Sequence, residues 1–122
     1  MFEWVRDGVD TKVISDEPKA DSVVIFGHAD PTKAHSDFFD PLSAYLKEDK
    51  VSDVPFLYLN GDAHKWNYKS DFYGQSNFLR IQVEGGTREP PLQVTLDNSK
   101  ARTKPPSEVF VYDRMLSLET IG

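Results

Sequence analysis

The sequence contains no cysteine, which excludes disulfide bonds, thiol catalysis and cysteine-ligated zinc sites. It also lacks any apolar run near the ~20 residues that a membrane-spanning helix requires, so we expect no membrane partner. The first ten residues carry acidic side chains and no apolar core, and a signal peptide is therefore not expected. These absences leave the cellular compartment open.

Positive charge is scarce as well. Lys and Arg number 14 against 20 Asp and Glu, which gives a formal net charge of −6. A nucleic-acid partner is not expected, because phosphate backbones are bound through clustered positive charge. The one local basic cluster, Lys100, Arg102 and Lys104, is predicted to belong to a solvated linker. With 122 residues, the chain is long enough for one globular domain or for part of one.

Two apolar runs stand out, and each ends close to a glycine that is followed by a histidine. The first run, Val23 to Phe26, precedes His28, and the second, Val54 to Leu59, precedes His64. Runs of this length that are rich in branched and aromatic residues predict buried strands. The two strand ends are therefore the first place to look for function.

A helix is predicted between these strands. It is expected to begin at Asp40-Pro41, because aspartate is a favoured N-cap and proline fits the first helical position. Strand, helix and strand in this order predict a βαβ unit with parallel strands, whose carboxyl ends share one edge of the sheet. We therefore expect His28 and His64 to lie near each other, either on neighbouring strands or with one strand between them.

The other segments complete the predicted α/β fold. A helix is predicted within 1–15 and an aromatic loop over 65–76. Alternating apolar residues in 79–83 and 92–96 predict a β-hairpin, with the turn at Gly85-Gly86. The predicted division is a domain over 1–97, a linker over 98–108, and a tail or edge strand over 109–122.

The two histidines are candidate metal ligands. Neutral imidazole is the commonest metal-binding side chain in proteins, and a glycine before it lets the backbone turn sharply. Asp62 and Asp30 supply oxygen donors near the same edge, although either is equally typical of an ordinary turn, which is the simpler interpretation for Asp30. A single histidine would more simply cap its loop by hydrogen bonding. Two at one sheet edge favour a shared metal site.

The segments Val24 to Asp30 (VIFGHAD) and Phe56 to Trp66 (FLYLNGDAHKW), followed by the strand Asn77 to Val83, resemble the C-terminal half of a calcineurin-like metallophosphoesterase. In that family a histidine at one strand end is followed downstream by Gly-His-x-His. The resemblance covers roughly residues 2–97. It implies half of an αββα sandwich, and it implies a centre of two divalent metal ions, of unspecified identity, that hydrolyses phosphoesters.

By this resemblance, His28 matches a ligand of the second metal and His64 matches a ligand of the first. Asp62 stands where the family has the first histidine of Gly-His-x-His. Aspartate binds magnesium-, manganese- or iron-like ions, so this departure implies either a changed metal preference or the loss of the second metal. His35 is a candidate for contacting substrate or protonating the leaving group; the simpler interpretation is a residue at a helix entry.

The family's other motifs, Asp-x-His, Gly-Asp-x-x-Asp and Gly-Asn-His, are absent before Val23. We therefore expect a metal-dependent phosphoester hydrolase that carries only part of its active site and is inactive alone. Its substrate, if the site is completed, would be a small phosphoester or a phosphoprotein. The alternative is a non-catalytic α/β fragment or interaction module that pairs with a partner chain, with self-association through an exposed sheet face. Three aromatic residues are candidates for contacting an organic leaving group at the sides of the site, or they simply pack within their loop: Trp66, Tyr68 and Tyr73.

Overall fold

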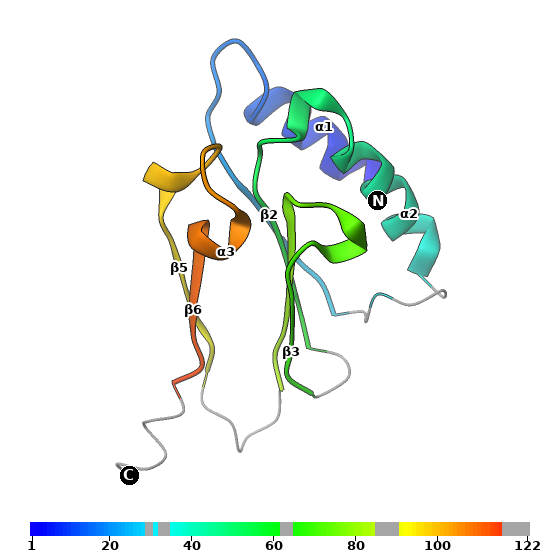
Figure 1. Ribbon diagram of the computed structural model, residues 1–122. Coiled ribbons are helices and arrows are strands. Elements are labelled where there is room, and N and C mark those ends of the chain that lie inside the picture. The colour runs from blue at the N-terminus through cyan, green and yellow to red at the C-terminus, as the bar shows by residue number, and fades with distance from the viewer. Residues whose placement is uncertain (29–30, 32–34, 62–64, 85–90, 116–122) are drawn as a thin grey trace.

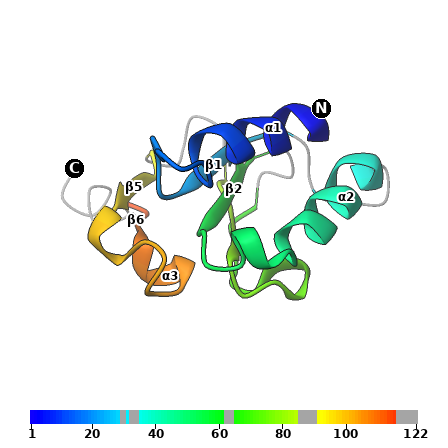
Figure 2. The same cartoon turned by 90° about the horizontal axis from the view of Figure 1, so that it is seen from above.

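The computed structural model describes residues 1–28, 31, 35–61, 65–84 and 91–115. The described chain forms three layers, which Figure 1 and Figure 2 show from two directions. Helices α1 (Phe2–Lys12) and α2 (Ser36–Leu46) cover one face of a four-stranded sheet. A two-stranded sheet and the short helix α3 (Pro106–Val109) lie against the other face. Among the described residues, no helix is long and apolar enough to cross a membrane.

The four-stranded sheet has the order β1-β2-β4-β3. Strands β1 (Val23–Phe26), β2 (Phe56–Asn60) and β4 (Phe78–Gln82) run parallel, and β3 (Asn67–Lys69) runs antiparallel to β4. The predicted βαβ unit is confirmed, and its two strands are direct neighbours. All three parallel strands therefore end at the same edge, which is the lower edge in Figure 1.

The sheet separates two apolar cores, because alternate residues of β2 and β4 face opposite layers. On the helix side, Phe56 and Phe78 pack with Phe39 and Leu42 of α2. On the other side the core consists of Leu57, Leu79, Ile81, Val109 and Phe110. The central strands are thus covered on both faces, which explains why their sequences are continuously apolar over most of their length.

The predicted β-hairpin is wrong. β4 pairs with β2 and β3, whereas β5 (Gln93–Leu96) pairs antiparallel with β6 (Phe110–Asp113) in the second sheet. The alternation of Leu79 and Ile81 with Arg80 and Gln82 suggested one solvated face. In the structure both polar side chains are buried, so β4 is a central strand and not an arm of a hairpin.

The predicted start of the second helix is also wrong. α2 begins at Ser36, one turn before Asp40, and contains Pro41 in its interior. An interior proline costs roughly 3 kcal/mol through its missing N–H and its ring clash. The preceding turn carries Phe39, which is 2% exposed and packs edge-on against Tyr58 at 5.1 Å between ring centroids. This burial outweighs the local preference for a start at proline.

Two segments expected to be irregular contain regular structure. The aromatic segment 65–76 includes β3 and the 3-10 turn η3 (Phe72–Gly74). The expected linker 98–108 includes the 3-10 turn η4 (Asn98–Lys100) and most of α3; a further turn, η2 (Asp49–Val51), follows α2. Arg102 is not a free linker cation, because it pairs with Asp21 at 3.3 Å and donates to the carbonyl of Val13 at 2.8 Å. This contact attaches the segment to the end of the first helix.

Several predictions are confirmed. The first helix lies within 1–15, β1 has the predicted limits, and the last strand occurs as β6 within 109–122. The second predicted strand, Val54 to Leu59, is displaced, since β2 begins two residues later and ends one residue later, at Asn60. The fold class is α/β with a mixed sheet of four strands and a second sheet of two.

Candidate functional site at the carboxyl edge of the sheet

The end of β1 is a close contact between backbone and side chain. The amide of Gly27 donates to the carbonyl of Leu59 at 2.9 Å, which continues the β1–β2 pairing by one residue. A Cβ on Gly27 would lie 2.2 Å from the hydroxyl oxygen of Tyr58, whose side chain is buried beneath it. Only glycine fits this position without a shift of the ring. The next residue, His28, is thereby placed at the sheet edge, where it is exposed.

The end of β2 is also closely packed, although less so than the end of β1. Asn60 is buried, and a Cβ on Gly61 would lie 3.0 Å from a methyl carbon of Val83, just beyond β4. The chain therefore leaves the sheet at Gly61 beside the end of the neighbouring strand. The glycine before each predicted ligand position thus has a physical reason in the packing.

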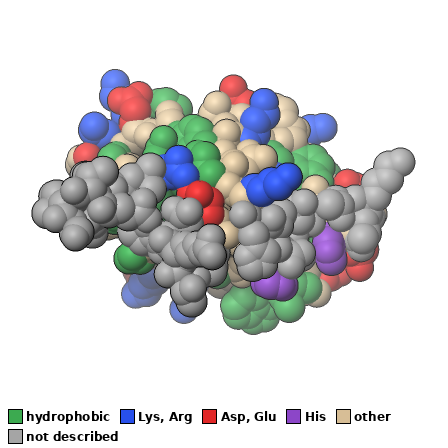
Figure 3. All heavy atoms as spheres, turned by 90° about the horizontal axis from the view of Figure 1, so that it is seen from below, with side chains coloured by type: hydrophobic (Ala, Val, Ile, Leu, Met, Phe, Trp, Pro, Cys, Tyr) green, Lys and Arg blue, Asp and Glu red, His purple; other side chains and the backbone are tan. Residues whose placement is uncertain are grey.

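His28 and Gly61 line one hollow of about 820 Å³ at this edge. Its apolar walls come from β1 and β2 on one side and from β5 on the other, with Phe26, Leu59 and Val94 among them. Figure 3 looks onto this end of the molecule, where the described histidine side chains reach the surface beside hydrophobic residues. The described ends of β1 and β2 thus lie at one hollow, and the shared metal site stays a prediction.

One ion pair lies in the wall of this hollow. The Arg114 guanidinium donates to the carboxylate of Glu84. The same guanidinium lies over the ring of Trp66, 4.2 Å from its centroid. The carboxylate of Glu84 therefore already has a cationic partner, and Trp66 is held in the wall by its contact with Arg114.

A network of buried polar side chains underlies the edge on the helix face. Arg80 Nε donates to Asn60 Oδ1 at 3.2 Å, and Arg80 Nη2 and Asn60 Nδ2 both donate to Gln82 Oε1. Gln82 Nε2 in turn donates to the carbonyl of Lys65 at 2.7 Å. The Arg80 guanidinium also lies over the ring of Phe72. Sequence reasoning missed these residues, because alternating polar residues on a strand normally mark a solvated face.

A second hollow of about 1030 Å³ lies on the other side of β1, between that strand and α1. His28 and His35 both line it. His35 is the N-cap residue of α2, which is the helix-entry position that its sequence context indicated. The structure thus places both histidines in the wall of the hollow on the helix side, whereas only His28 lines the hollow between the two sheets.

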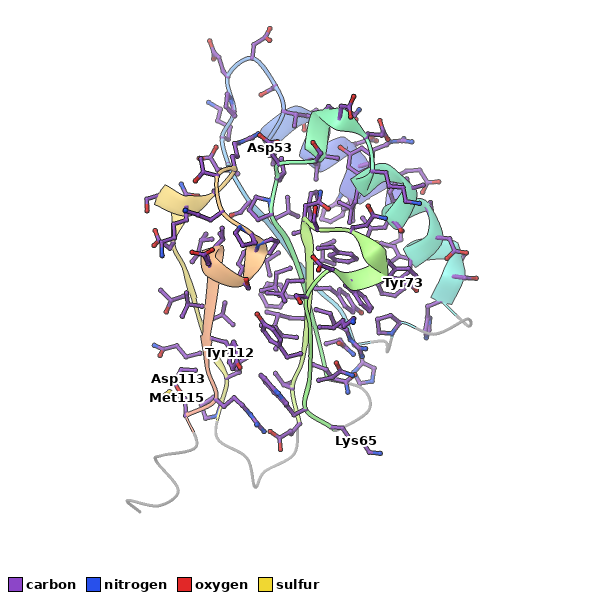
Figure 4. All side chains as sticks on the ribbon, in the orientation of Figure 1. Asp53, Lys65, Tyr73, Tyr112, Asp113 and Met115 are labelled. Carbon is purple, nitrogen blue, oxygen red and sulfur yellow. The ribbon has the colours of Figure 1, made fainter. Side chains whose placement is uncertain are left out.

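The candidate wall aromatics all pack within the fold. Trp66 and Tyr68 both contact Tyr112 of β6, at 5.3 and 5.1 Å between ring centroids. Figure 4 shows Tyr112 extending from β6 toward the four-stranded sheet. Tyr73 stacks on Phe39 at 6.0 Å, and burial raises its pKa. Only Trp66 of the three predicted residues also lines the hollow at the sheet edge.

The remaining candidate ligands, Asp30, Asp62 and His64, lie outside the described residues. Within the described part of the chain, no group of three His, Asp or Glu side chains is close enough together to hold one metal ion. His28 is a chemically suitable nitrogen donor, and Glu84 is engaged by Arg114. The described residues therefore supply one ligand of a metal centre, His28, and not a complete set of ligands.

No protein-family model matches this chain. No curated protein and no solved structure matches it either. Functional inference therefore depends on the geometry of the sheet edge.

Proposed function

We propose that this chain provides part of the active site of a calcineurin-like, metal-dependent phosphoester hydrolase. The observation that supports it is the parallel pairing of β1 with β2, in the register Phe26 to Leu59. This register brings His28 and Gly61 to one hollow. Gly61 precedes His64 by three residues in the chain. The motif resemblance requires such an arrangement of strand ends.

In this proposal His28, Asp62 and His64 hold divalent metal ions. Two such ions would supply a metal-bound nucleophilic water and polarise the phosphoryl oxygens. His35 contacts the substrate or gives a proton to the leaving-group oxygen from the α2 entry. The substrate is a small phosphoester or a phosphoprotein.

Because the described donors make up only one ligand, we expect other ligands to come from outside this set. The isolated chain should therefore bind a divalent ion weakly and hydrolyse no aryl phosphate. The two outcomes are separable, since metal binding needs only the ligands, whereas hydrolysis needs a complete centre and a bound substrate.

The test is metal binding by the full 122-residue chain, titrated with Mn²⁺ or Zn²⁺ and followed by calorimetry. His28→Ala and His64→Ala should each abolish the binding, because each removes a nitrogen ligand. His35→Ala serves as the matched control and should bind the ion like the unaltered chain. Absence of binding in the unaltered chain, or equal binding in all four proteins, would contradict the proposal.

A second candidate function, an interaction module, is favoured by the open edge of β1. Among the described residues β1 pairs only with β2, so the backbone groups of its other side have no strand partner. Phe26 is 79% exposed and Val24 is 38% exposed. Hollows lie on both faces of this strand, one against β5 and one against α1.

An extended strand of a second copy of the chain fits this edge. A strand is the element that can pair with a row of open backbone groups while sending alternate side chains into hollows on both faces. We expect the purified chain to self-associate as its concentration rises, measured by sedimentation equilibrium. Phe26→Ser should shift the protein toward monomer, whereas Val111→Ser, at a 50% exposed position of β6 that lines neither hollow, should not. A monomer at all concentrations would exclude this function.

A further inference from the structure

The backbone of β1 presents a regular set of open hydrogen-bonding groups. The amide of Val23 donates to the carbonyl of Pro55 at 3.0 Å, and the amide of Gly27 also faces β2. Because the backbone groups of successive residues point to opposite sides of a strand, the N–H and C=O groups of Val24 and Phe26 face away from β2. Among the described residues no strand pairs with this side of β1. The open edge therefore displays the donors and acceptors of these two residues.

The same two residues carry the exposed apolar side chains of the strand. Val23 and Ile25 pack against the helix-side core, whereas Val24 and Phe26 are exposed. Successive side chains alternate between the faces of a strand, so the two exposed side chains share one face. The exposed apolar surface continues onto the neighbouring helix α1 (Figure 2), where Trp4 is exposed and lines the same hollow as both residues.

A second copy of β1 is complementary to this edge when it runs antiparallel. From Ser22 to Gly27 the sequence contains no charged residue, so two such strands meet without repulsion although the chain has a net charge of −6. The antiparallel direction also places Asp21, just before one strand, near His28, just after the other. A parallel partner would instead bring the two Asp21 side chains to the same end. Charge therefore favours the antiparallel direction.

The open backbone groups limit the register of the two strands. Residues that lie opposite each other in an antiparallel pair share a face, and hydrogen-bonded pairs form between residues whose backbone groups face the partner. One register places Val24 of each copy opposite Phe26 of the other, so that the exposed apolar side chains cover each other. A shift by two residues would place Phe26 opposite Ser22 and leave this contact unmade.

We propose that two copies of this chain form a two-fold symmetric dimer through antiparallel pairing of β1 with β1, with Val24 of each copy opposite Phe26 of the other. The pairing joins two four-stranded sheets into one continuous sheet and leaves no open edge at β1. This inference rests on the self-association proposed above and specifies its strand, direction and register. Because β1 has four residues, whereas stable interfaces usually bury about 1,200–2,000 Å², we expect a weak dimer that dissociates on dilution.

The first test removes one open backbone donor. Val24→Pro deletes an N–H that faces away from β2, so the monomer loses no pairing between β1 and β2, and proline is tolerated on such an edge. Sedimentation equilibrium of the full chain should show a concentration-dependent dimer for the unaltered protein. The matched control Val24→Thr keeps the amide and the branched side chain and should dimerise as well. Val24→Pro should stay monomeric at the same concentrations and still unfold cooperatively on heating.

The second test reads the register by disulfide formation, because the sequence contains no cysteine of its own. The backbone groups of Ile25 face β2, so in the proposed dimer the two Ile25 residues form a non-hydrogen-bonded pair with Cα atoms about 4.5 Å apart, within disulfide range. The two Val24 residues are diagonal neighbours at about 7–8 Å. On oxidation in air, Ile25→Cys should form a covalent dimer on non-reducing electrophoresis, and Val24→Cys should not. Val24 is the more exposed of the two, so random collision would favour the opposite result.

The outcomes separate this dimer from self-association in general. A covalent dimer of Val24→Cys without one of Ile25→Cys would overturn the register. Self-association of Val24→Pro equal to that of the unaltered chain would overturn the backbone pairing. Either result leaves the proposed self-association standing. An unaltered chain that is monomeric at all concentrations, together with no covalent dimer of Ile25→Cys, would contradict the self-association and this dimer alike.

Discussion

β4 and β1 belong to the same sheet but differ in a way that their compositions do not suggest. β4 contains Arg80 and Gln82, yet all five of its residues are buried and both its edges are paired. β1 consists of four apolar residues, and its burial alternates between half-buried and exposed. The strand with more polar residues is thus in the centre, and the wholly apolar strand is at the edge.

The comparison shows that the position of a strand in the sheet decides its burial. The polar residues of β4 are stable inside because each hydrogen bond is made. The apolar residues of β1 remain exposed because the second sheet lies across β2 and β4 and does not reach the outer part of β1. An exposed apolar edge is uncommon in a stable monomer, and the self-association proposed above would cover it.

The largest expected effect comes from truncating one apolar side chain in each strand. Leu79→Ala in β4 removes a side chain that is 0% exposed and should lower the free energy of unfolding by about 2–5 kcal/mol. Phe26→Ala in β1 should change it by less than about 0.5 kcal/mol, because that ring is already in water. Urea unfolding of both variants measures the difference. Equal losses would show that β1 is covered in solution.

The carboxyl end of β1 is crowded, although its edge is open, and glycine substitutions test this. In Gly27→Ala the new Cβ meets the Tyr58 ring, and we expect a loss of about 1–3 kcal/mol. Gly8→Ala in α1 is the matched substitution, because nothing lies within 4 Å of its Cβ position. It should stabilise the helix by about 1 kcal/mol. Thermal unfolding should therefore shift in opposite directions for the two variants.

The smallest expected change in stability concerns the contact between α1 and α2. Helix α1 packs beside β1, and this contact holds it against α2. Tyr45 donates its hydroxyl to Asp10 at 2.6 Å, and Lys50 pairs with the same carboxylate at 3.2 Å. Burial opposes the charge of Asp10, but these two hydrogen bonds and the Lys50 charge lower its pKa overall. Tyr45→Phe should cost about 1 kcal/mol at neutral pH.

The pH dependence of this contact has a definite sign. Because the folded pKa of Asp10 is depressed, its contribution is complete above the unfolded pKa, near 3.8, and is lost as the pH falls through the folded pKa. The difference in unfolding free energy between the unaltered chain and Tyr45→Phe should therefore shrink in acid. Urea unfolding at neutral and acidic pH measures it, and a difference that grows in acid would contradict the assignment.

Local sequence patterns predicted the elements whose burial is simple. The apolar run of β1 has the limits expected of it, and the βαβ order correctly predicted that β1 and β2 run parallel. The start of α2 was missed, because Pro41 is a strong local signal that the burial of Phe39 overrides. The hairpin was wrong because pairing depends on which strands meet in space, and β4 and β5 are in different sheets.

For the candidate site, the sequence predicted where the described strand ends lie, and the metal ligands stay a prediction. His28 lies at the strand end and shares its hollow with Gly61, as expected from a glycine and a histidine after each strand. The ion pair of Glu84 with Arg114 and the buried hydrogen bonds of Gln82 had no recognisable local signal. Both join residues that are far apart in the sequence or that look like surface residues on a strand.

The sequence by itself determined that this chain is an α/β protein with two parallel strands, because periodicity, apolar runs and glycines are local properties of the chain. Only the tertiary structure decided which strand lies in the centre, which polar residues are buried, and that the edge of β1 stays open. Those features depend on hydrogen bonds and contacts between distant segments, such as Gln82 with Lys65 and Gly27 with Tyr58. They arise when the segments pack together, and no window of neighbouring residues contains them.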